Sequence, residues 1–213
     1  MSRKSRPPRQ TRAEIAARAA RHIVDGSAAD FEMARRKAAH ECGAERARDL
    51  PDNLELHRAV AEYLQLFHGT SHAARITRLR SAALAAMEFF APFDPRLTGP
   101  VLYGTACEHA VIDLLLSTDE IEAVTRHLLE RRRAYALTER SLRVAGLDGV
   151  QRLPVFELDL AGERIEALVS PAHGGSRVPL STLDGKPVKR AGIAAVRALL
   201  ESGQTFAAEH AYA

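Results

Sequence analysis

One carboxylate, Asp113, stands inside an apolar stretch. Residues 111–116 read Val-Ile-Asp-Leu-Leu-Leu, a pattern that favours a buried strand. A carboxylate in such a place is costly to bury unless it is paired or binds a metal ion, so Asp113 is a candidate site residue. The alternative is structural, with the Asp113 side chain bonded to a loop amide or paired with a nearby arginine.

A Gly-Thr turn, Gly104-Thr105, precedes the apolar stretch. Together they form the segment 102–116, which resembles the signature of the nucleotidyltransferase superfamily, the polymerase-β-like enzymes. Segments 34–39 and 50–53 are also similar to those of a bacterial group of nucleotidyltransferase-like proteins with a helical N-terminal region. This resemblance extends over most of the chain.

The resemblance implies roles for the turn and for Asp113. Gly104 and Thr105 match the turn, where backbone and hydroxyl approach a nucleoside triphosphate. Asp113 matches one of two carboxylates on a strand that hold Mg²⁺ for an in-line phosphoryl displacement. Because residues i and i+2 of a strand face the same side, the second carboxylate is expected at 111 or 115. These positions are Val111 and Leu115, so the carboxylate set is incomplete.

The resemblance also implies a third carboxylate on a neighbouring strand. The candidates are Glu157, Asp159 and Glu166, and we prefer Glu166 because it has apolar neighbours, whereas the other two border a turn. Asp113 and Glu166 are therefore the expected catalytic and metal-binding residues, with Mg²⁺ as the cofactor. The alternative for Glu166 is an edge-strand carboxylate that faces water.

Other polar residues could contribute to the same site. Glu108 and His109 follow the turn and could supply a substitute ligand or a general base, although a loop histidine is more often a hydrogen-bonded polar residue. A basic cluster near the C-terminus could bind a phosphate-bearing ligand. Its members are Arg177, Lys186, Lys189 and Arg190, of which we assign Arg177 and Lys186 to nucleotide binding alongside Gly104 and Thr105. The alternative is a solvated basic loop.

Two classes of function remain open. The first is a nucleotidyltransferase that transfers a nucleotidyl group from a nucleoside triphosphate with the help of a metal ion. The second is a catalytically inactive module that binds a nucleotide, nucleic acid or protein and acts in regulation. The chain has no P-loop, no Gly-x-Ser-x-Gly elbow and no Gly-x-Gly-x-x-Gly fingerprint, which argues against the enzymes that depend on those motifs.

The distribution of charge and cysteine bears on partners and location. The formal net charge is +3, but five basic residues precede the first acidic one, Glu14, so residues 1–11 are expected to form a flexible basic arm able to bind nucleic acid. The alternative is a solubilising terminus. Two distant cysteines and the lack of a long apolar run predict a cytoplasmic protein without a membrane segment.

The elements that must position these residues fall into two regions. Residues 12–93 show the 3.6-residue period of about four helices, at about 12–25, 28–42, 53–67 and 72–90. Ser27 and Asp30 are expected to cap the second helix, and Pro92 and Pro95 to mark the domain boundary.

Residues 96–203 predict a nucleotidyltransferase-like α/β domain with a mixed sheet, followed by a tail at 204–213. The fold class is therefore α+β. Strands are expected at Val101–Tyr103, Val111–Leu116, Leu142–Val144, Val155–Leu160 and Arg164–Val169. The last two are expected to form a hairpin through Ala161-Gly162. Ser117 and Glu120 have the spacing of a capping box for the next helix, and a final helix carries Ile193 and Val196.

Overall fold

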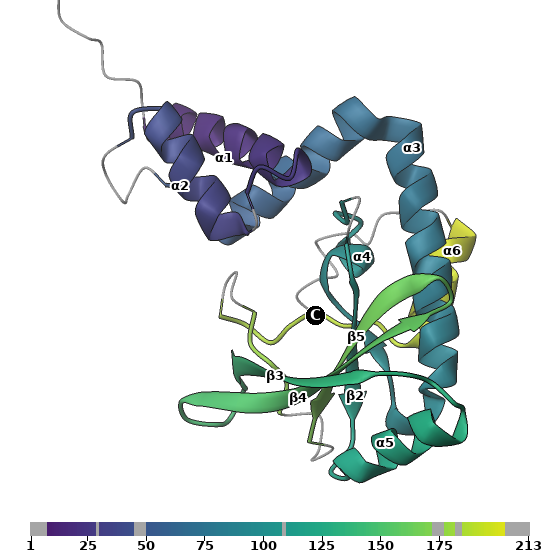
Figure 1. The fold of residues 1–213 in the computed structure, drawn as a ribbon. Coiled ribbons are helices and arrows are strands. Elements are labelled where there is room, and N and C mark those ends of the chain that lie inside the picture. The colour runs from purple at the N-terminus through teal and green to yellow at the C-terminus, as the bar shows by residue number, and fades with distance from the viewer. Residues whose placement is uncertain are drawn as a thin grey trace, which may run out of the picture. The chain divides into compact units, whose positions relative to one another are not determined.

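The computed structural model describes residues 8–28, 30–44, 50–107, 110–171, 177–181 and 185–202. These residues form two compact units, which we call the helical unit and the sheet unit (Figure 1). The helical unit extends to His72 and the sheet unit begins at Ala73. The expected α+β class, with helices first and a mixed sheet second, is confirmed.

The first two helices are α1 (Pro8–Val24) and α2 (Phe31–Glu41). Helix α1 begins before the expected Arg12, because proline suits the first position of a helix, whose amide has no helical acceptor. Asp30 caps α2, since its Oδ1 accepts a hydrogen bond from the Met33 amide at 2.7 Å. The cap is therefore Asp30 itself rather than a box that begins at Ser27.

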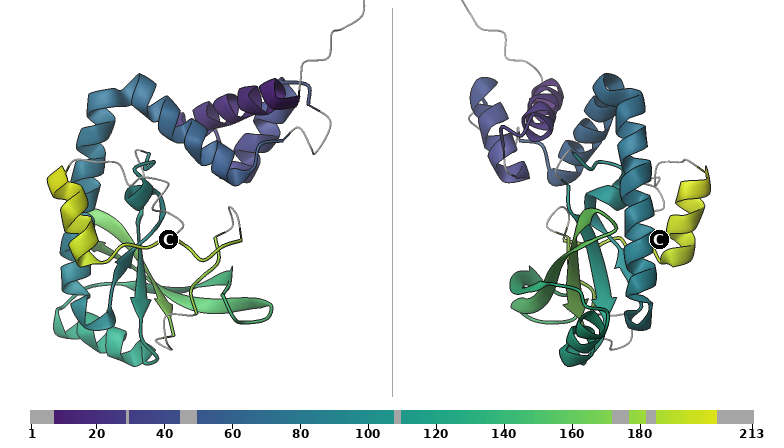
Figure 2. Two further views of the ribbon diagram at one scale, coloured as in Figure 1. Left: turned by 180° about the vertical axis from the view of Figure 1, so that it is seen from behind. Right: turned by 45° about the vertical axis from the view of Figure 1, so that its right-hand side comes forward.

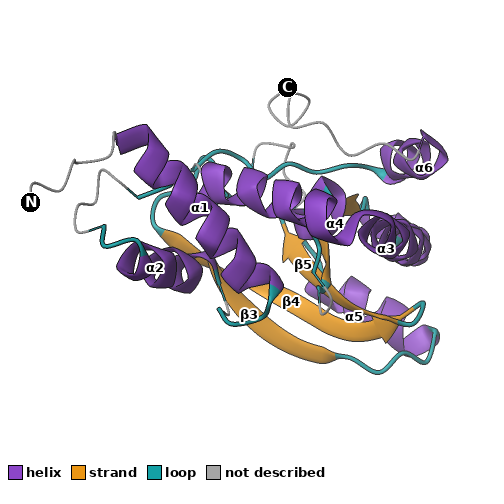
Figure 3. Cartoon of the chain, turned by 90° about the horizontal axis from the view of Figure 1, so that it is seen from above, coloured by secondary structure: helices purple, strands orange, loops and turns teal. Residues whose placement is uncertain are grey.

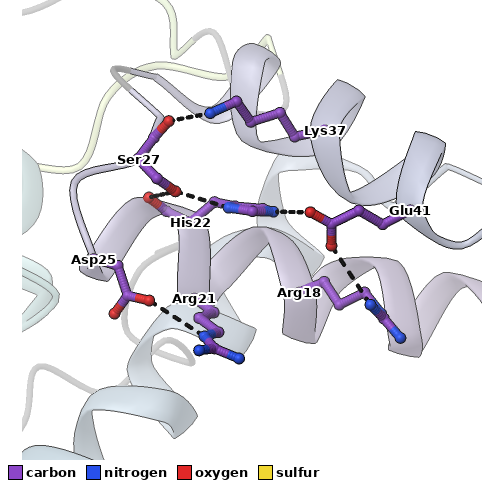
Figure 4. Close-up of polar contacts among 7 residues, drawn as sticks. All are labelled: Arg18, Arg21, His22, Asp25, Ser27, Lys37 and Glu41. Atoms are coloured by element: carbon purple, nitrogen blue, oxygen red, sulfur yellow. Dashed lines mark hydrogen bonds and ion pairs between the residues drawn. The ribbon is translucent and has the colours of Figure 1, made fainter.

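Polar side chains connect α1 to α2 (Figure 4). His22 lies 2.7 Å from Ser27 Oγ through Nδ1 and 2.9 Å from Glu41 Oε1 through Nε2. Arg18 approaches the other oxygen of Glu41 at 3.5 Å. Burial acts to raise the pKa of Glu41, but the hydrogen bond with His22 and the charge of Arg18 hold it below its ordinary value. Ile15 of α1 is fully buried in an apolar cluster that includes Ala34 and Ala38 of α2.

Helix α3 (Asn53–Phe89) contains both of the remaining expected helices. A reciprocal capping box starts it: Asp52 accepts from the Glu55 amide and Glu55 accepts from the Asp52 amide, each at 2.8 Å. Gly69, with φ 5° and ψ −98°, bends the helix without ending it, because no proline follows to block the next turn. The compact units divide just beyond this bend, so the second half of α3 belongs to the sheet unit.

The sheet unit is built on five strands in the order β1-β2-β5-β4-β3. The neighbours β2 and β5 are parallel and the other pairs are antiparallel. Figure 3 shows β3, β4 and β5 side by side. The bounds are β1 (Arg96–Leu97), β2 (Ile112–Ser117), β3 (Ala136–Arg143), β4 (Val150–Leu160) and β5 (Glu163–Ser170).

The expected hairpin between β4 and β5 is confirmed. Ala161 and Gly162 have φ of 53° and 80°, the left-handed pair that a tight two-residue hairpin requires. Strand β3 is longer than the expected Leu142–Val144 and starts at Ala136. Most side chains in its first half are exposed, so polar and apolar residues do not alternate there. A strand without this alternation is not predicted from the sequence pattern.

One face of the sheet packs on helices. Ile112, Phe156 and Ile165 are fully buried there with residues from the second half of α3 and from α5 (Ile121–Glu130). Helix α6 (Ile193–Ser202) lies beside α3, and Arg197 donates to Glu88 at 2.9 Å (Figure 2). The opposite face is not covered in this way and carries the candidate site residues.

Two local expectations are wrong. Residues Val101–Tyr103 lie in a short helix, α4 (Gly99–Tyr103), rather than in a strand, because Pro100 favours the first turn of a helix. Ser117 ends β2 and forms no capping box with Glu120. Thr118 Oγ1 instead accepts from the Glu120 amide at 3.1 Å, and α5 begins after it.

Among the described residues, no helix is both long enough and apolar enough to cross a lipid bilayer.

Candidate functional site

Three carboxylates form a row across the open face of the sheet. Asp113 on β2 is directly opposite Glu166 on the parallel strand β5, and Glu166 is opposite Glu157 on β4. Neighbouring strands lie about 4.8 Å apart, so consecutive members of the row are within reach of one another's side chains. The structure therefore brings together Asp113 and Glu166, the two residues that we expected to share a site.

The side chain of Arg140 on β3 crosses strand β4, which carries Glu157, and contacts both Asp113 and Glu166. Its Nη2 donates a hydrogen bond to Glu166 Oε2, and its Nη1 lies 3.7 Å from Asp113 Oδ1. The Arg140 side chain is 41% exposed and therefore borders solvent. One cation thus serves two carboxylates on adjacent strands, an arrangement that sequence reasoning did not find.

Burial is the main influence on Asp113. It raises the pKa of this carboxyl from 3.8 to about 6, with the charge of Arg140 acting to lower it and the charge of Glu166 acting to raise it. The group is therefore largely ionised at pH 7 but takes up a proton in mildly acidic solution. Such a pKa is typical of a carboxyl at a functional site or in a buried ion-pair network.

Close packing against Gly99 contributes to the burial of Asp113. Gly99 starts α4 with φ 68°, and a Cβ there would clash with Asp113 Oδ2 and lie 3.2 Å from its Cγ. The backbone of the same segment is tied to β2, since the Thr98 amide donates to the Asp113 carbonyl at 2.9 Å. Glycine is therefore favoured at position 99 for two reasons: its φ is positive, and any side chain there would clash with the Asp113 carboxylate.

The Gly104-Thr105 turn lies at the other end of α4. Gly104, with φ 75°, ends the helix, and the Thr105 amide donates to the Pro100 carbonyl at 2.9 Å. Thr105 is only 7% exposed, and its Oγ1 has no hydrogen-bond partner in the described part of the chain. Asp113 therefore contacts the start of α4, whereas the turn that we expected beside it closes the helix.

A buried arginine, Arg80 of α3, anchors α4. Its side chain is 4% exposed and donates to the carbonyls of Val101 at 3.3 Å and Leu102 at 2.9 Å. Burial lowers the pKa of this guanidinium. Because a helix end leaves carbonyls without helical partners, Arg80 satisfies groups that would otherwise be buried unpaired.

Of the two candidates not preferred for the third carboxylate, Glu157 has partners of its own. Glu157 accepts from Arg164 at 2.7 Å and from Thr138 at 3.0 Å, and these hydrogen bonds lower its pKa. Asp159 is exposed and stands opposite Arg164 in the sheet. Glu166 differs from both, because the arginine that contacts it, Arg140, also contacts Asp113.

The residues present fit one divalent cation better than two. Asp113 and Glu166 supply two carboxylates side by side, and no group of three histidine, cysteine or acidic residues that could hold a metal ion occurs among the described residues. Mg²⁺ is commonly held by one or two carboxylates together with substrate phosphates and water, so the pair meets that requirement. Glu108 and His109, the expected substitute ligands, lie outside the described residues.

Of the two expected phosphate ligands, Arg177 lies away from this pair. Arg177 follows β5, and its carbonyl accepts a hydrogen bond from Ser170 at the end of that strand. The Lys186 carbonyl accepts from the Ser181 amide at 2.7 Å, and its side chain is exposed. Glu166 precedes Ser170 by four residues, or about 13 Å of strand. The structure therefore groups Arg177 with the far end of β5.

Comparisons with models of protein families and with curated proteins gave no match for this chain. The inference about function therefore depends on the residues and their geometry.

Proposed function

We propose that this chain is a nucleotidyltransferase-like protein whose sheet unit binds a nucleoside triphosphate together with Mg²⁺. The observation that supports this most is the direct cross-strand pairing of Asp113 and Glu166 on one face of the sheet. Two adjacent carboxylates from parallel strands are the oxygen ligands that Mg²⁺ requires, with phosphate and water oxygens as the others. We also propose a cytoplasmic location, where nucleoside triphosphates are plentiful and cysteines outside disulfides, such as Cys42 and Cys107, persist.

The roles of the residues follow from their positions. Asp113 and Glu166 would hold the cation, and the bound cation would offset the negative charge of the transferring phosphoryl group. In the absence of a metal ion, Arg140 supplies one positive charge that the two carboxylates share. Once released from them, its guanidinium is available for bidentate contact with a phosphate. Burial, and after it the charge of Glu166, raise the pKa of Asp113, so an added positive charge nearby would favour the ionised form of Asp113.

A second candidate function, a non-catalytic binding module, is favoured by the same arginine. Arg140 already contacts both carboxylates, so the three side chains form a structural ion network without any ligand. In this case the protein acts through binding of a nucleotide, a nucleic acid or another protein. The basic arm at residues 1–11 is the expected nucleic-acid contact, and residues 1–7 of it lie outside the described residues.

Calorimetric titration of the full chain with MgATP tests the proposal. Asp113→Asn and Glu166→Gln are each expected to weaken binding at least tenfold at pH 7.5, whereas Glu157→Gln, in the same row but paired with Arg164, serves as the matched control. Affinity of the unaltered chain should fall as the pH drops below about 6, because Asp113 then takes up a proton. Equal binding by all three variants would refute the proposed site.

The substitution Arg140→Gln separates the two candidate functions. If the carboxylate pair binds Mg²⁺, loss of the competing guanidinium should increase the affinity for the metal alone, and added Mg²⁺ should restore the melting temperature of the variant. If the trio is only structural, the variant loses stability and Mg²⁺ does not restore it. Melting curves measured with and without Mg²⁺ at about 5 mM distinguish the two outcomes.

Nucleic-acid binding by the arm has its own measurement. A chain that lacks residues 1–11 loses Arg3, Lys4, Arg6 and Arg9. If these residues contact phosphates of duplex DNA, the slope of log affinity against log salt should become shallower by roughly three to four. An unchanged slope would assign any nucleic-acid binding to another surface.

A further inference from the structure

A second polar site occupies the opposite end of the same sheet face, where β2 and β5 finish. A pocket of about 250 Å³ lies there, lined by three arginines, Arg96, Arg177 and Arg190, together with Ser117 and Ser170. Ser117 and Ser170 are the last residues of the two parallel strands and are paired in the sheet. The carboxyl ends of parallel strands are a common place for ligands in open α/β sheets.

The backbone fixes two of the three arginines beside each other. Arg96 belongs to β1, whose next residue, Leu97, exchanges two hydrogen bonds of 2.9 Å with Ala191. Arg190 precedes Ala191 and is therefore held at the same edge. Gly192 completes the arrangement, because a Cβ at this position would lie 2.8 Å from Arg96 Nη1. The side chain of Arg96 thus packs directly on the chain that carries Arg190.

The third arginine is fixed from the other side of the pocket. Ser170 is 2% exposed and its hydroxyl donates to the Arg177 carbonyl at 2.9 Å. The next residue, Val178, is buried, and its carbonyl accepts from the Ala145 amide at 2.9 Å. Residues far apart in the sequence therefore place three guanidinium groups around one pocket.

The charges around this pocket are not balanced. Asp94 accepts from Arg96 at 2.8 and 2.9 Å and compensates that one arginine. For the side chains of Arg177 and Arg190 the described residues provide no hydrogen-bond or ion-pair partner, and both are exposed. Among the described residues that line the pocket, three guanidinium groups and one carboxylate leave a formal charge of +2.

From this geometry we infer that the pocket is a binding site for a dianionic phosphate group, either free phosphate or a phosphate monoester. Guanidinium groups match the oxygens of phosphate with paired hydrogen bonds, and two uncompensated arginines match its two charges. The Ser117 hydroxyl at the pocket wall supplies a neutral donor. The pocket is separate from the Asp113–Glu166 pair, since Asp113 and Ser117 are about 13 Å apart along β2.

Titration of the full chain at pH 8 with inorganic phosphate and with ribose 5-phosphate tests the inference. Binding should be lost, with affinity reduced at least tenfold, in the double variant Arg177→Gln/Arg190→Gln. The matched control is Arg152→Gln, an exposed arginine of the same sheet on β4. Tighter binding of ribose 5-phosphate would identify a monoester as the ligand, and equal affinities would identify the phosphate group alone.

The outcomes also separate this site from the proposed function. Asp113→Asn should leave phosphate binding unchanged, so a failure of MgATP binding does not affect the inference. Circular dichroism verifies that each variant is folded. No saturable binding by the unaltered chain at about 10 mM phosphate, roughly a thousandfold above a dissociation constant of about 10 μM, would overturn the inference. Binding that survives the double substitution, or that falls equally in Arg152→Gln, would also overturn it.

Discussion

The two ends of the open sheet face have opposite electrostatic designs. At the acidic end, Asp113 and Glu166 share Arg140, and the carboxylates are partly buried. At the basic end, Arg177 and Arg190 are exposed and lack carboxylate partners among the described residues. Both ends lie on β2 and β5, so the same two strands present both.

The apolar middle of this face keeps the two ends apart. Leu115, Val155 and Leu168 are buried there, together with Val178 from the segment that follows β5. The two ends differ in internal countercharge: at the acidic end Arg140 contacts both carboxylates, whereas Arg177 and Arg190 at the basic end have no carboxylate partner among the described residues. Loss of Arg140 should therefore cost stability at the acidic end, whereas the arginines of the basic end should serve a ligand.

Charge reversal should produce the largest difference between the ends. Arg140→Glu places a third carboxylate beside Asp113 and Glu166, and we expect it to lower the free energy of unfolding by roughly 2–4 kcal/mol. Arg177→Glu should change it by less than about 0.5 kcal/mol, because the side chain is exposed and faces other arginines. Urea denaturation at pH 7.5 measures both. Equal losses would show that the two ends do not differ in compensation.

Glycine substitutions should give the next largest effect. Gly99→Ala combines a left-handed φ, worth about 1–2 kcal/mol, with a clash against Asp113, so a loss of roughly 2–3 kcal/mol is expected. Gly146→Ala is the matched control, since it has φ 72° but open space around it. At the basic end, Gly192→Ala should cost least, because only the flexible tip of Arg96 must move.

A double substitution tests the clash itself. Asp113→Ala should recover part of the stability that Gly99→Ala removes, so that the two changes are coupled by about 1 kcal/mol. Additive losses would mean that Gly99 is required for its φ alone.

The sequence predicted the acidic end in part. An aspartate in an apolar strand pattern indicated Asp113, and the preference for Glu166 over its neighbours placed a second carboxylate on a strand that the structure pairs with β2. Arg140 was not predicted, because it lies in an exposed strand without a clear polarity pattern and because strand register cannot be read from local residues.

Two further residues had signals that could have been used. Arg80 falls on the apolar stripe of its helix, between the buried Leu79 and Ala83, and a charged residue on such a stripe requires a buried partner. Gly99 directly precedes Pro100, a dipeptide typical of a turn rather than of a strand. The basic end depends on the Leu97–Ala191 bridge, a contact between segments nearly a hundred residues apart that no local pattern indicates.

The pH dependence of stability should distinguish two carboxylates of the same row. The pKa of Asp113 is raised to about 6, so the folded state binds more protons than the unfolded state between about pH 4 and 6. The unfolding free energy therefore falls as the pH rises through this window, by roughly 2–3 kcal/mol from this group. Asp113→Asn removes that fall, so its stability relative to the unaltered chain should increase from pH 4 to pH 7.

Glu157→Gln is the control for this effect, with the opposite sign. The pKa of Glu157 is lowered by its hydrogen bonds with Arg164 and Thr138, so its contribution is present above the unfolded-state pKa and is lost as the pH falls. Parallel pH profiles for the two variants, measured by thermal melting, would contradict the role of burial at Asp113.

The smallest effect should come from removal of the unbalanced arginines. In a ligand-free buffer of low salt, Arg177→Gln/Arg190→Gln should raise the free energy of unfolding by a few tenths of a kcal/mol, because repulsion among like charges is relieved. Arg164→Gln, which loses its partner Glu157, should lower it by a similar amount. About 0.5 M salt should reduce both changes, since both pairs border solvent. A clear loss of stability in the double variant would show that these arginines support the fold. If stability is not lost, a role in folding does not explain why Arg177 and Arg190 lie around one pocket, whereas a role in anion binding explains it.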